Sequence, residues 1–194
     1  MAYPELLVLR HGQTEWNAAG RHQGQLDSPL TALGHQQAAA QREILRRFDL
    51  SGWRAACSPS VRAVQTAASA LKDTGLIPKY DKGLREVHFG AWQGLTSAAI
   101  AAQWPALDPE LHEPLAWNFM SPGGEDFSIL AARAKAVLNA LTGPTVIVIH
   151  GIFSRVLRGL WLGVGFDAMR ELGGGQGAIY HMQAGRQAKL EAEV

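Results

Sequence analysis

Three short hydrophobic runs alternate with longer stretches in which apolar residues recur at helical spacing. The runs span residues 5–10, 53–58 and 145–150, and each is followed by Gly or Pro. Short apolar runs bounded in this way are typical of buried β-strands that lead into α-helices. We therefore predict a strand in each run, with a helix after it.

Helical spacing follows these runs and recurs through the middle of the chain. The expected helices span residues 31–48, 58–71, 96–104, 108–118, 126–141 and 151–162. Ser58 followed by Pro59 is typical of a helix N-cap and first helical position. Two further strands are expected at residues 178–183 and 187–191, joined by a turn at Gly185.

The alternation of strands and helices predicts an α/β fold, a three-layer α/β/α sandwich around a mostly parallel mixed sheet. No internal repeat or linker interrupts the 194 residues, which is a usual length for one hydrophobic core. We therefore expect a single domain over residues 1–194.

Composition and charge narrow the class of protein. Hydrophobic residues make up 47% of the chain and charged residues 18%, which supports a buried core and excludes a mainly disordered chain. The formal net charge is +1, so no overall field attracts nucleic acid or an anionic membrane. The apolar stretches are too short to span a membrane, and the N-terminal residues do not resemble a signal peptide. Cys57 is the single cysteine, so we expect a reducing, cytoplasmic location.

Basic side chains lie at the ends of the three hydrophobic runs. Arg10 and His11 end the first, Arg62 lies one helical turn after the second, and His150 ends the third. Because the carboxyl ends of parallel strands share one edge of a sheet, we expect these side chains to lie together. Two Arg and two His repel one another without an anion, and guanidinium groups match phosphate oxygens. The sequence therefore predicts a phosphoryl site, to which a helix starting near Gly151 adds N–H donors and the positive end of its dipole.

Motifs along nearly the whole chain resemble those of the histidine phosphatase superfamily, also called phosphoglycerate mutase-like. In chain order they are Leu9-Arg10-His11-Gly12-Gln13-Thr14-Glu15-Trp16-Asn17, Gln23-Gly24 to Asp27-Ser28-Pro29-Leu30-Thr31, Ser58-Pro59 with Arg62-Ala63 and Gln65-Thr66-Ala67, Leu84-Arg85-Glu86 with Phe89-Gly90-Ala91-Trp92-Gln93-Gly94, Pro122-Gly123-Gly124-Glu125, and His150-Gly151 with Arg155. An Arg-His-Gly tripeptide alone is weakly specific, but this ordered set is highly specific. The resemblance implies a phosphoglycerate mutase-like fold and phosphoryl chemistry.

The resemblance also implies catalytic roles for five residues. His11 would attack phosphorus and form a phosphohistidine, which requires a neutral imidazole. Arg10, Arg62 and His150 would clamp the phosphoryl oxygens. Glu86 would protonate the leaving oxygen and then activate water. Because a carboxyl group must hold a proton for the first task, we expect an acidic-to-neutral optimum for activity.

Further polar residues of the same motifs are expected near the substrate. Asn17 matches a superfamily position that donates to the phosphoryl group, and Gly151 begins the expected helix behind it. Gln23 and Gly24 would bring polar groups of a turn near the substrate. For Thr14, a local hydroxyl-to-backbone bond and a contact with phosphate are equally open.

A metal site is the other way to interpret the same side chains. His11, Glu86 and His150 could form a two-histidine, one-carboxylate metal triad. Two adjacent guanidinium groups disfavour a metal ion there, so we expect neither a metal nor a cofactor. Surface or capping roles are expected for the remaining histidines, which are His22, His35, His88, His112 and His181.

A helical segment at about residues 87–132 is expected to cover the active site. It contains no Lys or Arg, whereas phosphoglycerate mutases of the superfamily carry basic residues there. The chain therefore resembles the phosphatase branch, in particular the broad-specificity and alpha-ribazole phosphatases, although Ile152 stands where many relatives have Gly or Asn. Helix packing is the favoured role for each large apolar side chain of the segment, with one or two facing the substrate. These side chains are Trp92, Trp104, Trp117, Phe119 and Met120.

These observations predict a metal-independent phosphomonoesterase that acts on a small intracellular phosphorylated metabolite. We expect a monomer or homodimer, with no nucleic-acid or membrane partner. A 2,3-bisphosphoglycerate-dependent phosphoglycerate mutase is the alternative enzyme. A phosphate-binding or phosphoprotein-binding module without turnover is the alternative from another class.

Overall fold

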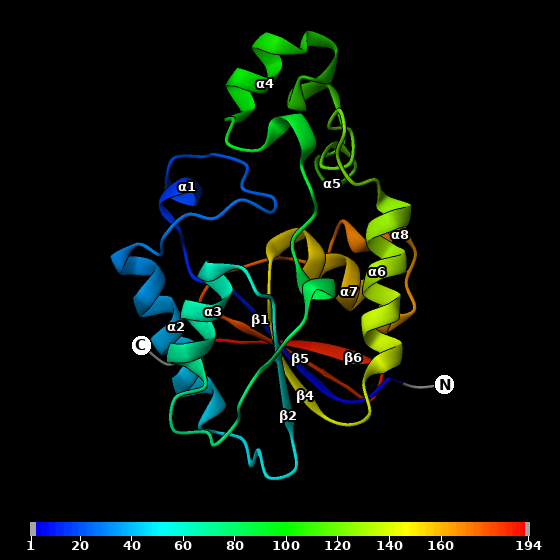
Figure 1. The fold of residues 1–194 in the computed structure, drawn as a ribbon. Coiled ribbons are helices and arrows are strands. Elements are labelled where there is room, and N and C mark those ends of the chain that lie inside the picture. The colour runs from blue at the N-terminus through cyan, green and yellow to red at the C-terminus, as the bar shows by residue number, and fades with distance from the viewer. Residues whose placement is uncertain (1–2, 193–194) are drawn as a thin grey trace.

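A six-stranded mixed sheet forms the centre of the computed structural model, which describes residues 3–192 (Figure 1). The strands are β1 (Leu6–Arg10), β2 (Arg54–Cys57), β3 (Lys79–Tyr80), β4 (Thr145–Ile149), β5 (Ile179–Gln183) and β6 (Arg186–Leu190). Their order is β3-β2-β4-β1-β5-β6. The first four run parallel to one another, whereas β5 is antiparallel to β1 and β6 is antiparallel to β5. The predicted mostly parallel, mixed sheet is confirmed.

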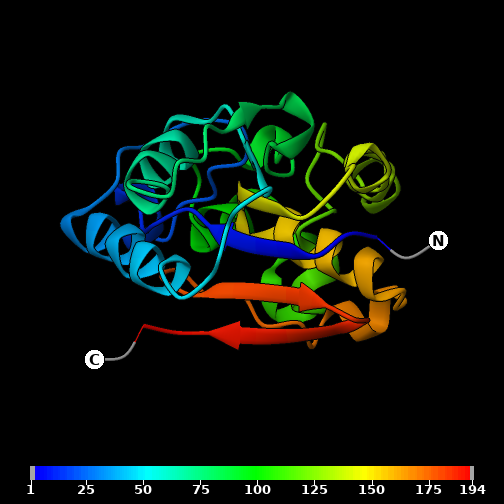
Figure 2. The same ribbon diagram turned by 90° about the horizontal axis from the view of Figure 1, so that it is seen from below.

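Helices cover both faces of this sheet, as the view along the layers in Figure 2 shows. They are α2 (Ala32–Leu45) and α3 (Val61–Ala70) on one face, and α6 (Phe127–Ala140) and α7 (Gly151–Leu162) on the other. Because successive strand residues point to opposite faces, Leu7 and Leu9 pack with α2 and α3, whereas Leu6 and Val8 pack with α6 and α7. The predicted three-layer sandwich is confirmed.

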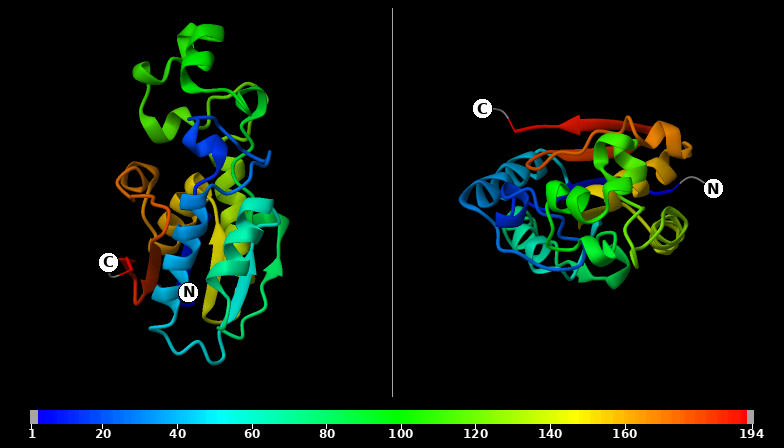
Figure 3. Two further views of the ribbon diagram at one scale, coloured as in Figure 1. Left: turned by 90° about the vertical axis from the view of Figure 1, so that its left-hand side faces the viewer. Right: turned by 90° about the horizontal axis from the view of Figure 1, so that it is seen from above.

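The chain between β3 and α6 passes beyond the carboxyl end of the parallel strands. Its elements are η1 (Lys82–Leu84), η2 (Gly90–Trp92), α4 (Ser97–Gln103), η3 (Pro105–Leu107), η4 (Pro109–Leu111) and α5 (Pro114–Trp117). Figures 1 and 3 show α4 and α5 projecting past the end of the sheet. The remaining helices are α1 (Glu15–Ala18) and α8 (Phe166–Met169).

Two predicted helices differ from the structure. The helix expected over residues 108–118 does not form, because Pro109 and Pro114 each start a new short turn and cannot continue the preceding one. The helix expected from Ser58 begins at Val61 instead. The Ser58 hydroxyl lies 2.7 Å from Nε2 of His150 rather than capping the helix.

The short elements were not predicted, whereas the closing hairpin was. The strand β3 has two residues, and α1 and α8 have a single turn each, so hydrophobic spacing gives no signal for them. The hairpin of β5 and β6 forms where it was expected, with Gly185 at φ 73° in the turn. Residues 1–2 and 193–194 of the predicted domain lie outside the described residues.

Two chain segments, residues 88–91 and 121–125, meet where the covering segment leaves and rejoins the sandwich; we call this pair the neck. The Ser121 hydroxyl donates to the Phe89 carbonyl, the Ala91 N–H donates to the Pro122 carbonyl, and further backbone bonds join the two sides. At Gly90, with φ 42°, a Cβ atom would lie 2.3 Å from the Pro122 carbonyl oxygen. Only glycine permits this approach, so the neck fixes both ends of the covering segment.

Candidate active site

A cavity of about 220 Å³ lies beyond the carboxyl ends of β1 and β4, and the covering segment contributes Phe89 and Asn118 to its wall. It is lined by Arg10, His11, Asn17, Arg21, His22, Gln23, Arg62, Glu86, Phe89, Asn118, Gly151, Ile152, Arg155 and Gly174. The structure therefore brings together most of the residues that the strand-end pattern and the motifs point to. His150 lies directly behind this wall, with its ring centroid 5.2 Å from that of His11.

His11 presents Nε2 to the cavity as a hydrogen-bond acceptor. Its Nδ1 lies 2.8 Å from the Gly12 carbonyl, which can only accept, so the proton of the neutral ring is on Nδ1. Nε of Arg62 donates to Nε2 over 3.3 Å. Burial, with the Arg62 and Arg10 charges nearby, holds the pKa of His11 well below its ordinary value of 6.5. His11 is therefore neutral at physiological pH, with a lone pair on Nε2.

Arg62 is held from three sides, and its side chain is 1% exposed. From α3, its Nη1 donates to the Leu26 carbonyl and to Oδ1 of Asp27, and its Nη2 donates to the Gly24 carbonyl at 2.8 Å. Asp27 also accepts the Val61 N–H through Oδ2, which caps α3. These bonds fix the guanidinium beside His11 and leave Nε directed at the ring.

Arg10, which precedes His11 in the chain, packs closely on the start of α7. A Cβ atom on Gly151 would lie 3.2 Å from Cζ of Arg10, so the glycine leaves room for the guanidinium. Nε of Arg10 is buried and has no hydrogen-bond partner among residues 3–192. Burial lowers the pKa of Arg10; Glu86 opposes this effect, and Arg155 and Arg62 add to it. The arrangement leaves a desolvated positive charge at the cavity wall, which attracts an anion.

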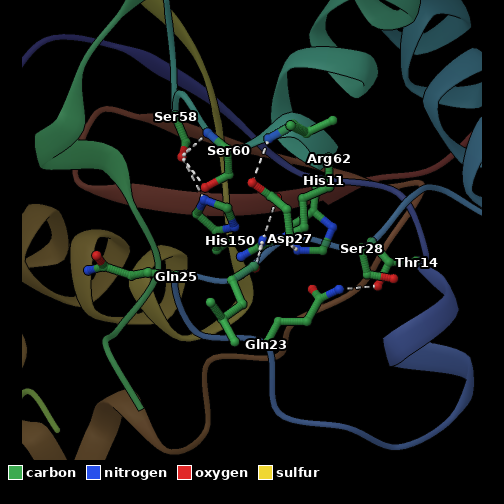
Figure 4. A network of polar contacts seen from close by, with 12 residues as sticks. His11, Thr14, Gln23, Gln25, Asp27, Ser28, Ser58, Ser60, Arg62 and His150 are labelled. Carbon is green, nitrogen blue, oxygen red and sulfur yellow. Dashed lines mark hydrogen bonds and ion pairs between the residues drawn. The ribbon is translucent and has the colours of Figure 1, made fainter. Parts of the chain in front are cut away.

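His150 occupies the N-cap position of α7 and is fully buried. Its Nε2 lies 2.7 Å from the Ser58 hydroxyl, as Figure 4 shows, and its Nδ1 has no partner among the described residues. Burial is the largest cause that lowers its pKa well below 6.5, with the Arg62 charge next. Neutral His150 can therefore donate one N–H group beside His11 without adding charge.

Glu86 receives the N–H groups that the sequence suggested for phosphate. Its Oε1 accepts from Val87 and Phe153 at 3.0 and 2.9 Å, and its Oε2 accepts from Ile152 at 3.1 Å. Two of these donors belong to the first turn of α7, so the positive end of that helix faces the Glu86 carboxylate. The expectation that these helix donors contact a phosphoryl group is therefore corrected, although Gly151 itself lines the cavity.

Arg133 on α6 holds the backbone that carries Glu86, and sequence reasoning did not identify it. Its Nη1 donates to the carbonyls of Gly83 and Arg85, and its Nη2 contacts the Glu86 carbonyl at 3.3 Å. The same guanidinium makes a two-point contact with Glu125 of the neck. The motif residue Glu125 therefore acts through Arg133 rather than at the cavity.

The loop after β1 divides between the cavity wall and the scaffold behind it. The hydroxyl of Thr14 accepts the Asn17 N–H at 3.1 Å and Nε2 of Gln23 (Figure 4), so the local-bond interpretation of Thr14 is the one observed. Oδ1 of Asn17 accepts from the Thr14 N–H and from Nε2 of Gln176. The amide nitrogen of Asn17 therefore points away from these two residues. Asn17 and Gln23 line the cavity, whereas Thr14 and Gly24 do not. Gly24 instead supplies the carbonyl that binds Arg62.

Several cavity residues were not predicted from sequence. Arg21 and His22 follow α1, and His22, expected at the surface or in a cap, lies edge-on to Phe89 and Trp117. Burial lowers the pKa of His22. Arg155 belongs to the superfamily motif that begins at His150, but its distance from His150 in the sequence does not by itself give Arg155 a function. A signal for Arg155 was available, because it lies one helical turn after Gly151 and therefore on the same face of α7.

The large apolar side chains of the covering segment pack together instead of lining the cavity. Trp92 and Trp117 are buried and stacked, with ring centroids 4.5 Å apart. Trp104 and Phe119 pack against the same core, and Met120 is partly exposed. Besides His11, the aromatic rings that line the cavity are those of Phe89 and His22. None of the five side chains lines the cavity, which agrees with the favoured packing role of the four aromatic ones and not with the allowance that one or two face the substrate.

Other chemical alternatives receive no support from the arrangement of side chains. Within residues 3–192, no group of three or more His, Cys, Asp or Glu side chains could hold a metal ion, so the His11, Glu86 and His150 set is not a metal triad. Cys57 is buried as expected, and burial raises the pKa of its thiol to about 12. No described helix is both long and apolar enough to cross a membrane.

Comparison with known proteins agrees with this geometry. The sequence matches the histidine phosphatase superfamily (branch 1) over residues 6–191. A glucosyl-3-phosphoglycerate phosphatase of Mycobacterium tuberculosis is 38% identical over 160 residues, which cover 75% of this chain and 70% of that protein. A structure of a mycobacterial glucosyl-3-phosphoglycerate phosphatase in complex with VO₃ has a TM-score of 0.83 at 33% identity, covering 98% of this chain and 100% of the other.

A more distant structure, a candidate alpha-ribazole-5'-P phosphatase from Escherichia coli, has a TM-score of 0.79 at 22% identity over 99% of this chain and 97% of the other, and shows the same fold. The named relatives are phosphatases, which fits the phosphatase interpretation better than the mutase alternative. The chain belongs to the histidine phosphatase superfamily and is a phosphatase.

Proposed function

We propose that this phosphatase hydrolyses phosphomonoesters through a phosphohistidine formed at Nε2 of His11. The observation that carries the proposal is the neutral His11 ring, which lines a cavity flanked by Arg10 and Arg62 and whose unprotonated Nε2 accepts from Nε of Arg62 over 3.3 Å, a contact that phosphorus would replace. When a neutral imidazole attacks phosphorus, stabilisation of charge at the phosphoryl oxygens contributes more to catalysis than removal of a proton by a strong base. Arg10, Arg62 and Nδ1 of His150, which has no partner within residues 3–192, would supply donors for these oxygens.

In the first step, the Nε2 lone pair attacks phosphorus while the bond from phosphorus to the ester oxygen breaks. The electron pair of that bond goes to the leaving oxygen, which takes a proton from Glu86 and departs as an alcohol. Glu86 is placed for this task because its carboxyl group lines the cavity, where three backbone N–H groups fix its position. Asn17, Gln23 and Gly151 would position the phosphoryl group from the other walls.

In the second step, water attacks phosphorus as the bond from phosphorus to Nε2 breaks. Glu86, now a carboxylate, accepts the proton of that water, which restores the carboxyl group and the neutral His11 ring. The sum is one ester and one water converted into one alcohol and one orthophosphate. No metal or cofactor enters this balance.

The partner of the site is a small phosphomonoester, and we propose that it is an intracellular metabolite. A cavity of about 220 Å³ lined mostly by polar and charged side chains agrees with a small phosphorylated substrate. The covering segment 87–132 would bound the leaving group, since Phe89 and Asn118 lie in the wall. A single buried thiol, Cys57, agrees with a reducing compartment such as the cytoplasm.

The decisive experiment is hydrolysis of para-nitrophenyl phosphate in EDTA by the parent protein and by His11→Ala, with His35→Ala on the exposed side of α2 as the matched control. We expect the parent and His35→Ala to release nitrophenol at the same rate. We expect His11→Ala to lose at least about three orders of magnitude in kcat, as for loss of other nucleophiles.

The stability of the protein-bound label in acid and in base identifies the intermediate in the same samples. After a rapid quench with labelled substrate, the parent should carry acid-labile, base-stable label on a histidine, and His11→Ala should carry none. Turnover by His11→Ala at the parental rate, or label elsewhere in the chain, contradicts the phosphohistidine mechanism. Binding of orthophosphate without any turnover by the parent would establish a binding module instead.

A further inference from the structure

The Gly-rich loop between α8 and β5 takes no part in the mechanism proposed above. It spans residues 173–177 with the sequence Gly-Gly-Gly-Gln-Gly, and its second residue, Gly174, lines the cavity. Glycine has no side chain, so Gln176 supplies every side-chain contact that this loop makes with the rest of the molecule. The loop therefore places a single amide group close to the cavity wall.

The side chain of Gln176 binds Asn17, which lies 159 positions earlier in the chain. Its Nε2 donates to Oδ1 of Asn17 at 3.0 Å, and the Thr14 N–H donates to the same oxygen at 3.2 Å. Because a backbone N–H can only donate, the atom of Asn17 that it contacts must be the amide oxygen. The two contacts therefore fix which end of the amide is oxygen, and Nδ2 is the end left for a ligand.

The orientation of this amide decides what Asn17 can do at the cavity wall. In the proposed mechanism Asn17 positions the phosphoryl group, which its Nδ2 can do by donating to a phosphoryl oxygen. An amide turned over would present lone pairs of Oδ1 to that oxygen, and two acceptors repel each other. Asn17 is therefore useful as a donor only while other groups hold its oxygen away from the ligand.

Gln176 is the second of the two supports that hold this oxygen. The first is the capping box at the start of α1, in which the Thr14 hydroxyl also accepts the Asn17 N–H at 3.1 Å. A single bond to Oδ1 leaves the plane of the amide free to turn about that bond. A second donor from a separate segment of the chain restricts this rotation, and Gln176 supplies it at the shorter distance of the two.

A buried guanidinium holds the start of the loop that carries Gln176. Arg158 on α7 is fully buried, and its Nη2 donates to the Gly173 carbonyl. Its Nε donates to the Ser154 hydroxyl at 3.1 Å, and Cζ lies 3.8 Å from the centre of the Tyr180 ring. Burial lowers the pKa of Arg158 to about 10, so the group is charged at neutral pH. Because charged donors form stronger hydrogen bonds than neutral ones, Gly173 is firmly held.

The other end of the loop packs on α2. At Gly177, with φ 82°, a Cβ atom would lie 3.3 Å from Cγ of Gln37, so the backbone of the loop lies against that side chain. Oε1 of Gln37 in turn accepts the Gln13 N–H at 2.7 Å, which ties it to the loop after β1. Both ends of the Gly-rich loop are thus fixed to helices of the sandwich, with Gln176 between them.

We propose that Gln176 is a positioning residue of this phosphatase, which holds the Asn17 amide with its nitrogen directed at the phosphoryl group. The inference rests on the proposed function and adds a residue from outside the superfamily motifs, the last of which ends at Arg155. Gln176 does not itself line the cavity, so it acts through Asn17 rather than on the substrate. Its effect should therefore be the same for every phosphomonoester, whatever the leaving group.

Removal of the Gln176 donor tests the proposal in the full chain. Gln176→Met keeps the length of the side chain, and we expect kcat/KM to fall by about 2- to 10-fold, the usual effect of one hydrogen bond. The fall should be equal for para-nitrophenyl phosphate and glycerol 3-phosphate. The Ki of orthovanadate, a mimic of the phosphoryl group, should rise by the same factor.

The control for this variant is Gln183→Met on β5, because Gln183 is exposed and does not line the cavity. We expect it to keep the parental kcat/KM and the parental Ki of orthovanadate. Parental values of both quantities in Gln176→Met would overturn the proposal. A fall for one of the two substrates alone would overturn it as well, since Gln176 would then act on the leaving group.

A double-mutant cycle shows whether Gln176 acts through Asn17. In an Asn17→Ala background, Gln176→Met should change neither kcat/KM nor the Ki further, because the amide that it orients is absent. Asn17→Asp is a second background, which keeps the acceptor of the capping box. Both ends of a carboxylate are oxygens, so Gln176 has no amide to orient there. A full effect of Gln176→Met in both backgrounds would overturn the proposal, because Gln176 would then act on the fold.

Failure of the proposed function would look different from failure of this inference. If the phosphohistidine mechanism is wrong, His11→Ala turns over para-nitrophenyl phosphate like the parent. If the mechanism holds and the role of Gln176 is wrong, His11→Ala is inactive, and Gln176→Met either keeps the parental values or has its full effect without Asn17.

Discussion

The two ends of the cavity are built by different parts of the fold. The phosphoryl end consists of Arg10, His11, Arg62 and His150. The covering end consists of Arg21, His22, Phe89 and Asn118. Side chains of the first set come from strand ends and the first turn of α3, whereas those of the second come from loops and short turns. The sheet thus fixes the groups that meet phosphorus, and the loops above it fix what else the substrate may carry.

The difference extends to how each set is held. Arg62 of the phosphoryl end is bound by two backbone carbonyls and Asp27, and is almost fully buried. Arg21 of the covering end has one backbone contact and is exposed. Substitutions at the phosphoryl end should therefore affect every substrate, whereas those at the covering end should act selectively.

The largest expected effect below that of His11 is at Glu86. Glu86→Gln keeps the size of the side chain but removes the proton donor, so we expect kcat to fall by about 10²- to 10⁴-fold. The loss should be greater for an alkyl phosphate than for para-nitrophenyl phosphate, because nitrophenolate departs without a proton. Glu171→Gln, at an exposed position, is the control. An equal loss for both leaving groups would contradict the acid role.

Arg10→Met should separate activity from stability. Loss of a donor to the phosphoryl group should lower kcat/KM by about 10²- to 10³-fold. Because Nε of Arg10 is buried without a partner in the described part of the chain and other arginines lie nearby, we expect the free energy of unfolding to rise by about 1 kcal/mol, or about 2–4 °C in Tm. Thermal unfolding without phosphate measures this, with Arg186→Met as the control. A lower Tm for Arg10→Met would show that the guanidinium stabilises the empty fold.

The smallest expected effect is the pH dependence of stability. Burial holds the pKa of His150 and His11 well below 6.5 in the folded protein, so the unfolded chain binds more protons as the pH falls below 6.5. Their contribution to stability is therefore present above pH 6.5 and is lost below it. Urea unfolding at pH 7.5 and 5.5 should show this loss. His150→Asn should reduce the difference more than His22→Asn, since the pKa of His22 is less depressed; the reverse order would contradict the comparison.

The phosphoryl end could be predicted because its residues are adjacent in sequence to strands. Arg10 ends β1, His11 follows it, and His150 follows β4. Because the carboxyl ends of parallel strands lie at one edge of a sheet, these residues are expected to lie close together. The sandwich itself was predicted for the same reason, from local hydrophobic spacing. The error at residues 108–118 has a local cause as well, since Pro109 and Pro114 interrupt a pattern that is otherwise helical.

The covering end and the supports of Glu86 could not be predicted in this way. Arg133 reaches Glu86 from 47 positions away, and Arg21 depends on a bridge to Thr96 for its place at the rim. The first-turn N–H groups of α7 were expected to face phosphate, yet a carboxylate from a separate segment takes them. These contacts are made between segments, and no spacing within one segment encodes them.

Because the neck holds both of its ends, the covering segment can be exchanged as one unit. The two sides of the neck are tied by Ser121, Phe89 and the bonds around Gly90, while Arg133 ties them to the sandwich. We expect replacement of residues 92–120 by the matching piece of a relative to leave Glu86 and the strand ends in place, as long as that piece keeps the contacts of Gly94 and Thr96 with Arg21. Such an exchange should transfer the leaving-group preference of one homologue to another. The substrate ranges of natural homologues can diverge in the same way while the rest of the fold is kept.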